Sequence, residues 1–152
     1  MPVIDDITLY LPTHPTQVYA KRNLSEIDTI VVHQTDSKDS GKFGAYDIAR
    51  YHVNNNGWAG IGYHYYIIKD GKIFKTQEPS TISYHASNWN TRSIGVVITG
   101  DHRYNSSKTN EEIIGNTQYK ALVWTLAKLQ TQLPNKANIL SHGELSTSKS
   151  DP

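Results

Sequence analysis

The chain has 152 residues, of which 37% are hydrophobic and 19% are charged, and its formal net charge is +1. This length and composition predict one globular domain with a substantial core. The small net charge argues against a general nucleic-acid binder, which needs a concentrated basic face. Because the chain has no cysteine, disulfide scaffolds, thiolate metal sites and cysteine nucleophiles are excluded.

The N-terminal stretch MPVIDDITLYLP lacks the basic segment and the long apolar core of a secretory signal. No run of the sequence approaches the roughly 20 apolar residues that cross a membrane, so no membrane insertion is expected. We therefore expect a protein made in the cytoplasm, which another factor must release if it acts outside the cell.

The first half of the chain alternates irregular and regular segments. Residues 1–26 contain three prolines and little periodicity, which predicts an N-terminal arm of irregular structure. Residues 27–33 (IDTIVVH) are β-branched and apolar, as in a buried strand. A helix is predicted next, ending at the Asn-rich stretch before Gly57, because one helical face carries Ala45, Ile48, Ala49, His52 and Val53.

Residues 62–75 (GYHYYIIKDGKIFK) predict a β-hairpin in which Asp70 and Gly71 suit a tight primed turn. Residues 93–100 predict a second buried strand, and residues 137–140 a short one. Between them, Thr117 is predicted to cap a helix that ends before Pro134 and has an apolar face of Leu122, Leu126, Leu129 and Leu133. Strands that alternate with two helices predict an α/β single domain, with a central mixed β-sheet flanked by α-helices.

The histidines are the first candidates for chemistry, because imidazole binds metals and titrates near neutral pH. His33 and His142 each follow an apolar strand, and ligand sites gather beyond the carboxyl ends of strands in α/β sheets. With Asp151 they would form a three-ligand zinc site that leaves one position open. Spacing alone supports this weakly, because a chain with seven histidines offers many such triples. His52 is interpreted as a satisfied core histidine.

The order of several segments resembles the type-two N-acetylmuramoyl-L-alanine amidases. These segments are IVVHQT, ARYH, NNGW, GYHYYIIKDGKIF, HASNWNTRSIGVVITG and SHGELSTSKSDP. This zinc-dependent family includes amidase-type phage lysozymes and the peptidoglycan recognition proteins. The resemblance covers residues 27–152 and leaves residues 1–26 unexplained. It implies an endolysin catalytic domain that continues past Pro152, with a cell-wall-binding domain following in the full-length chain.

The resemblance also implies residue roles. His33, His142 and Asp151 match the ligands of one zinc ion, and Tyr63 and Lys149 match catalytic positions. Five residues are assigned to the substrate groove: His85, Asn90, Trp89, Trp58 and Arg92. In such a groove aromatic rings pack on sugars, and an arginine can bind a carboxylate through two hydrogen bonds.

One branch of the family has a catalytic glutamate where this chain has Val97, so the chain is closer to the branch that relies on tyrosine and lysine. Glu144 is the nearest alternative carboxylate and is interpreted as structural. In a regular strand Tyr63 and Tyr65 would share one face and His64 the other. We therefore expect Tyr63 to face the reaction centre and His64 to be buried and bonded to backbone.

The implied reaction is hydrolysis of the amide between N-acetylmuramic acid and L-alanine in bacterial peptidoglycan. This would lyse the cell wall once the protein, made in the cytoplasm of a host bacterium, has been released to act on it. Two alternatives stay open at this point. The chain could be a non-catalytic peptidoglycan-binding recognition module, although the presence of all three ligand candidates favours the enzyme. It could also be an unrelated α/β domain whose histidines are incidental.

Overall fold

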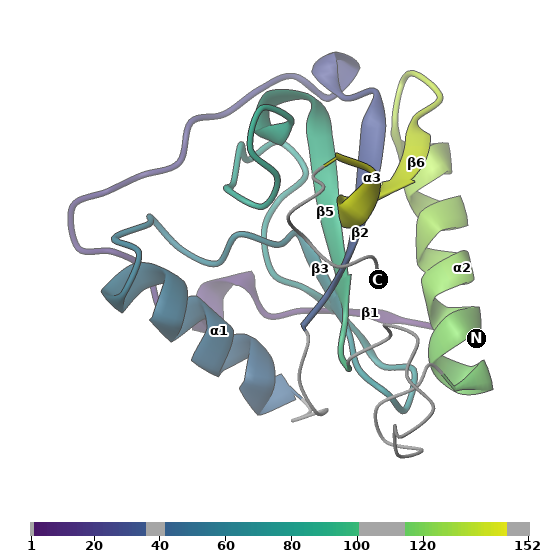
Figure 1. The fold of residues 1–152 in the computed structure, drawn as a ribbon, viewed down its shortest axis with the longest axis horizontal. Helices are drawn as coiled ribbons and strands as arrows, with labels where there is room; N and C mark the ends of the chain where they lie inside the picture. The colour runs from purple at the N-terminus through teal and green to yellow at the C-terminus, as the bar shows by residue number, and fades with distance from the viewer. Residues whose placement is uncertain (1, 36–41, 101–114, 146–152) are drawn as a thin grey trace.

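The computed structural model describes residues 2–35, 42–100 and 115–145. In this part of the chain six strands form one mixed sheet in the order β1-β4-β3-β5-β2-β6 (Figure 1). The strands are β1 (Ile4–Asp6), β2 (Thr29–Gln34), β3 (Tyr65–Ile67), β4 (Ile73–Lys75), β5 (Ser93–Ile98) and β6 (Asn138–Ser141). The helices are α1 (Lys42–Asn54), α2 (Asn116–Gln132) and α3 (His142–Leu145), with short 3-10 turns at Thr8–Tyr10, Leu24–Glu26 and Asn90–Arg92.

The centre of the sheet is built from parallel strands. β2 pairs with β5 on one side and with β6 on the other, and every residue of β2 and β5 is buried. Their β-branched composition suits a strand that is covered on both faces. The predicted strands, the mixed sheet and the α/β class are confirmed.

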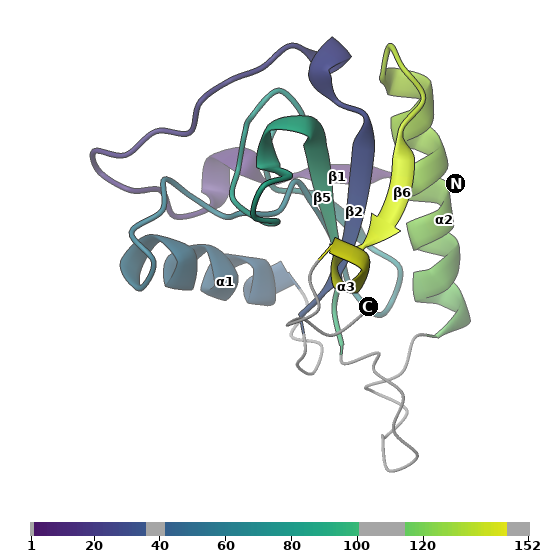
Figure 2. The same cartoon turned by 45° about the horizontal axis from the view of Figure 1, so that its top comes forward.

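The two long helices lie on opposite sides of the sheet (Figures 1 and 2). On the α2 side, the buried cluster includes Ile30, Tyr65, Ile94 and Leu129. On the α1 side, a smaller cluster contains Ala45, Tyr66, Phe74 and Val97, with Ile48 and Tyr63 packed against it. The smaller cluster leaves room for a pocket on the α1 side of the sheet.

The β3–β4 hairpin forms as predicted, but its turn differs. The Ile68 N–H donates to Lys72 O (3.1 Å), and the Gly71 N–H donates to Ile68 O (3.0 Å). Gly71 has φ of 92°, whereas Asp70 has no positive φ. The loop therefore has three residues with glycine at the last. The predicted two-residue primed turn was wrong, because every primed turn needs a positive φ at its first central residue, which here would be Asp70.

The predicted alternation through Tyr63 was also wrong. Tyr65 packs on the α2 side, while Tyr63 packs with Tyr66 on the α1 side. The regular strand begins only at Tyr65, and just before it the carbonyl of His64 accepts N–H groups from both Thr76 (2.8 Å) and Gln77 (3.3 Å). The two N–H groups opposite one carbonyl form a β-bulge just after β4. Tyr63 precedes the first residue of β3, so the alternation of the strand does not extend to it.

Helix α2 follows its apolar pattern but is not capped as predicted. Its N-cap is Gly115, which makes no side-chain cap hydrogen bond, and Thr117 lies inside the first turn. The helix ends as expected, with Leu133 as C-cap before Pro134.

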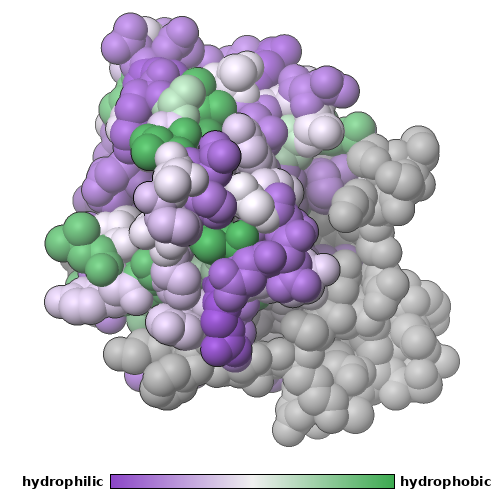
Figure 3. All heavy atoms as spheres, turned by 90° about the vertical axis from the view of Figure 1, so that its left-hand side faces the viewer, coloured by the Kyte–Doolittle hydropathy of each residue, from purple (hydrophilic) through white to green (hydrophobic). Residues whose placement is uncertain are grey.

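Residues before Ile27 also belong to the folded unit. β1 pairs in parallel with β4 at the edge of the sheet, and Lys21 forms an isolated bridge with Thr81. The side of the molecule shown in Figure 3 is mainly hydrophilic, with small separate hydrophobic areas. Within the described ranges, no helix has the length and hydrophobicity that crossing a membrane requires.

We predict that Leu129→Ala lowers the free energy of unfolding by about 2–5 kcal/mol, because it removes a buried side chain that holds α2 against the sheet. Leu129 is 1% exposed, whereas Val123 on the same helix is 47% exposed. Val123→Ala is the matched control and should change the free energy by less than about 0.5 kcal/mol. Urea denaturation measures both, and equal losses in the two variants would contradict the assigned faces of α2.

Candidate active site

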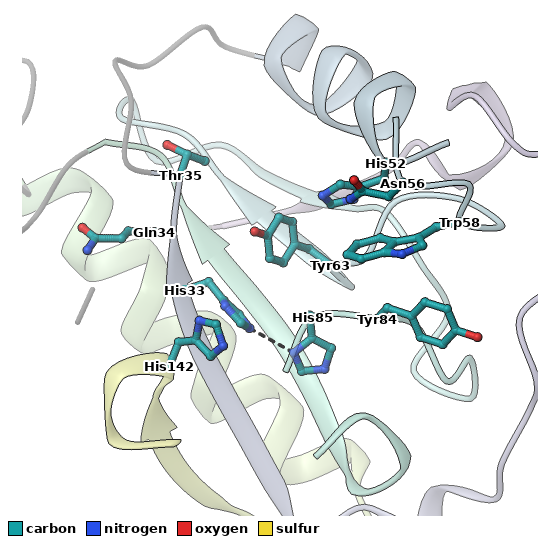
Figure 4. A pocket seen from close by; sticks show the side chains of 10 residues that line it. All are labelled: His33, Gln34, Thr35, His52, Asn56, Trp58, Tyr63, Tyr84, His85 and His142. Carbon is teal, nitrogen blue, oxygen red and sulfur yellow. Dashed lines mark hydrogen bonds between the residues drawn. The ribbon is translucent and has the colours of Figure 1, made fainter. Parts of the chain in front are cut away.

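A pocket of about 260 Å³ opens beyond the carboxyl end of β2. Figure 4 shows side chains from β2, α1, the segment before β3, the loop before β5 and α3 converging on it. Its lining residues are His33, Gln34, Thr35, His52, Asn56, Trp58, Tyr63, Tyr84, His85 and His142.

Strand pairing brings together two histidines that are distant in sequence. Val32 of β2 is paired with Ser141 of β6 in a parallel register. The next residue in β2 is His33, and the residue after Ser141 is His142, which begins α3. The ring centroids of these two histidines lie 4.5 Å apart. The predicted pairing of these two imidazoles is present in the structure.

Two other predicted site residues, one metal ligand and one catalytic residue, fall outside the part of the chain that the structure describes. Asp151 and Lys149 lie outside the described residues. Among residues 2–35, 42–100 and 115–145, no group of three His, Cys, Asp or Glu side chains could hold a metal ion. The described chain thus contributes two imidazoles, which are chemically suitable metal ligands.

Tyr63 lies in the pocket as predicted. It is half-buried, and its ring centroid lies 5.1 Å from that of His33 and 5.8 Å from that of His52. Its backbone carbonyl accepts a hydrogen bond from Thr76 Oγ1 (2.6 Å), which fixes the residue at the start of the hairpin.

His64 has the structural role predicted for it. Its ring is fully buried, its Nδ1 accepts the Gly95 N–H (3.0 Å), and its Nε2 lies 2.8 Å from Thr81 O, to which it donates. Burial, helped by the nearby Arg22 and Lys21 charges and opposed by the hydrogen bond to Thr81 O, lowers the pKa of His64 to about 3. The ring is therefore neutral and ties three segments of backbone together.

His52 is a pocket residue that sequence reasoning placed in the core. Its Nδ1 accepts the Gly62 N–H (3.0 Å), and its ring centroid lies 4.6 Å from that of Trp58. Burial lowers the pKa of His52 to about 4. Because Nδ1 accepts a hydrogen bond, the neutral ring carries its proton on Nε2.

Several other lining residues were also missed. Gln34 and Thr35 directly follow His33, so the rule that sites form beyond strand ends could have included them. Asn56 follows α1, and Tyr84 comes from the loop before β5; nothing in their sequence context distinguishes them.

His85 and Trp58 line the pocket, but Asn90, Trp89 and Arg92 do not. Asn90 Oδ1 accepts the backbone N–H groups of His85 (2.9 Å) and Ala86 (2.8 Å) and so shapes the loop.

Arg92 donates two hydrogen bonds to the carboxylate of Asp28, from Nε to Oδ1 (2.8 Å) and from Nη2 to Oδ2 (2.6 Å). Its guanidinium lies 4.5 Å from the Trp89 ring centroid. Asp28 precedes β2, at the end of that strand opposite to His33. A role of Asn90, Trp89 and Arg92 in a longer substrate groove stays a prediction.

The N-terminal segment holds the pocket loops in place. Arg22 is 7% exposed, and its guanidinium donates to Pro79 O (3.1 and 2.9 Å) and to Asn90 O (2.8 Å). These carbonyls flank the loop that carries Tyr84 and His85. Burial lowers the pKa of Arg22 to about 10, which leaves the cation intact at neutral pH.

Comparisons with known proteins agree on one family. A family model described as N-acetylmuramoyl-L-alanine amidase (Amidase_2) matches residues 23–152. Peptidoglycan-recognition protein SC2 of Drosophila melanogaster is 37% identical over 60 residues, which are 40% of this chain and 33% of that protein. The endolysin of Escherichia phage T7 is 34% identical over 73 residues, which are 48% of each chain. The matched segments thus span half or less of these curated relatives.

A solved structure also matches nearly the whole chain. It is the N-acetylmuramoyl-L-alanine amidase LysC from Clostridium intestinale URNW, with a TM-score of 0.72 and 25% identity. The match covers 95% of this chain and 85% of that one.

The buried neutral histidines predict a pH dependence of stability. In the unfolded chain, His52 and His64 take up protons as the pH falls below about 6.5. In the folded chain they take up protons only when the pH approaches their lowered pKa values of about 4 and about 3. The free energy of unfolding should therefore fall as the pH drops from 7 toward 4, by at most about 1.4 kcal/mol per pH unit for each histidine.

Urea denaturation at several pH values tests this dependence. His52→Asn keeps an acceptor for the Gly62 N–H and removes one titrating ring, so the slope against pH should become shallower. An unchanged slope would show that His52 does not stay neutral in the fold.

Proposed function

The chain belongs to the N-acetylmuramoyl-L-alanine amidase family, and on this premise we propose that it is a zinc-dependent peptidoglycan amidase. The bond cleaved would join N-acetylmuramic acid to L-alanine. The observation that supports this most is the pair of imidazoles, His33 and His142, which the β2–β6 pairing brings together in a pocket. The endolysin relatives support a role in lysis of the bacterial cell wall, reached from the cytoplasm of a phage-infected host.

The residues that would hold the zinc ion are His33, His142 and Asp151, with Asp151 as the carboxylate in a chain that has no cysteine. When bound in such a site, zinc activates water as a nucleophile near neutral pH and polarises a carbonyl oxygen. The ligand set fits this ion, because imidazole nitrogen and carboxylate oxygen are among its usual ligands.

The protein groups around the pocket would supply orientation and proton transfer. In amide hydrolysis, oxygen adds to the carbonyl carbon, the carbon–nitrogen bond breaks, and the leaving amine of L-alanine takes a proton. The Tyr63 hydroxyl would orient the water, or bond the oxyanion and relay that proton. Lys149 is proposed to place a positive charge where the oxyanion develops.

The pocket wall opposite the two histidines suits a sugar–peptide substrate. Trp58 and Tyr84 pack edge to face with ring centroids 5.7 Å apart, and they offer aromatic surface for a sugar ring. The Nε2–H of His52 is a donor in the same wall.

A non-catalytic peptidoglycan-binding module is the second candidate. It is favoured by the relative named as a recognition protein. Such a module would bind peptidoglycan through the same pocket and leave the amide uncut.

Mass spectrometry of purified peptidoglycan after digestion tests the proposal. We expect free stem peptides with a new L-alanine amino terminus and uncut glycan strands. The products should disappear with a zinc chelator, return when zinc is added, and be absent with His33→Ala. Cleaved sugar linkages, or cuts within the stem, would contradict the proposed bond, and wall binding without products would support the recognition module.

We predict that Tyr63→Phe lowers kcat at least about 100-fold, because it removes a hydroxyl engaged in proton transfer or oxyanion binding. The ring and its packing are kept, so zinc content should stay at the wild-type level. The matched control is Tyr46→Phe, which removes the hydroxyl of a tyrosine that is 44% exposed on α1. Equal kcat values for Tyr63→Phe and wild type would remove Tyr63 from the mechanism.

A further inference from the structure

We infer that a hydrogen-bond chain from Ser93 through His85 fixes the proton of His33 on Nε2 and thereby directs the Nδ1 lone pair of His33 to the metal. This inference rests on the proposed function, because it concerns how a proposed zinc ligand is prepared. Ser93 and His85 act through His33 and are therefore positioning residues. Figure 4 shows the contact between His33 and His85 in the pocket.

A backbone carbonyl determines which group donates and which accepts in these hydrogen bonds. Ser93 Oγ lies 2.7 Å from Trp89 O, and a carbonyl oxygen can only accept, so the serine hydroxyl donates there. The same Oγ lies 3.2 Å from His85 Nε2. Since the hydroxyl proton is already used, Oγ accepts and His85 Nε2 must be the donor.

The remaining steps follow from the two rings. A neutral imidazole carries one proton, and the contact with Ser93 Oγ places it on Nε2 of His85. With that proton on Nε2, Nδ1 of His85 is an acceptor. It lies 2.9 Å from His33 Nε2, which therefore donates. A neutral His33 then has its lone pair on Nδ1.

The packing around His85 holds this geometry independently of the hydrogen bonds. Gly95 of β5 faces the ring, and a Cβ added there would lie 2.7 Å from His85 Cγ. Asn90 Oδ1 also accepts the backbone N–H of His85. A glycine at position 95 thus makes the space in which His85 can meet both Ser93 and His33.

The hydrogen bonds from Ser93 through His85 select one of the two tautomers of His33. A metal binds only the nitrogen without a proton, and the hydrogen bond at the other nitrogen decides which one that is. Loss of the His85 acceptor would remove its preference for the Nε2 proton of His33, so that a larger fraction of the protein would have the proton on Nδ1. Partners of this kind typically contribute about 10- to 100-fold to metal affinity.

Two isosteric substitutions separate hydrogen bonding from packing at position 85. His85→Asn keeps an acceptor near the position of Nδ1, whereas His85→Leu has a similar shape and no acceptor. Ser93→Ala removes the first acceptor of the chain without changing His85. Thermal unfolding monitored by circular dichroism establishes that each variant is folded before it is compared.

The first readout is the tautomer of His33 in metal-free, ¹⁵N-labelled protein, from long-range ¹H–¹⁵N spectra. We expect a protonated Nε2 in wild type and His85→Asn, and a mixture of tautomers in His85→Leu and Ser93→Ala. The second readout is zinc affinity by competition with a chelator. We expect a 10- to 100-fold weaker Kd for His85→Leu and Ser93→Ala, and a Kd closer to wild type for His85→Asn.

Two outcomes would overturn the inference. One is a wild-type His33 with its proton on Nδ1, and the other is His85→Leu with the wild-type tautomer and zinc affinity. A different result would overturn the proposed function instead. Wild-type protein that shows the Nε2 proton yet binds no zinc would confirm the hydrogen-bond chain and reject its role in zinc binding.

Discussion

The parallel register of β2 with its neighbours is the constraint on which the site depends. One strand end carries His33, the neighbouring strand end leads into His142, and the pairing of Val32 with Ser141 makes them adjacent. The same strand pairs with β5, which supplies Gly95 and Ser93 to the environment of His85. A shift of this register by one residue would move these side chains to the opposite faces of the sheet.

The histidines in and around the pocket have different structural roles. His64 is buried and joins backbone segments, His52 closes one wall through the Gly62 N–H, and His85 orients His33. Each is held neutral mainly by burial, so each has one donor and one acceptor nitrogen. Backbone groups fix the donor and acceptor nitrogens of His52 and His64, and the Ser93 hydroxyl fixes those of His85. In this way the fold determines which hydrogen bonds the pocket histidines can make.

Much of this arrangement could be predicted from the sequence. Apolar, β-branched runs identified the buried strands, and strand-end positions identified His33 and His142. The resemblance to a family, rather than spacing, singled out Tyr63 and His85. Local departures from regular geometry were not predictable in the same way.

The orientation of Tyr63 depends on an irregular strand start, which no residue pattern indicates. His52 sits at a helical core position, yet its ring reaches the pocket wall because the Gly62 backbone meets it there. The partners of Arg22 and Arg92 depend on tertiary contacts between segments far apart in the chain.

The proposed function requires His33 and His142 to be the imidazole ligands of one zinc ion. X-ray absorption at the zinc edge, on protein loaded with one equivalent of zinc, would identify the ligands. We expect one tightly bound zinc per chain with the scattering pattern of two imidazoles, reduced to one in His142→Ala. Zinc that fails to bind, or that binds without imidazole, would rule out this zinc centre.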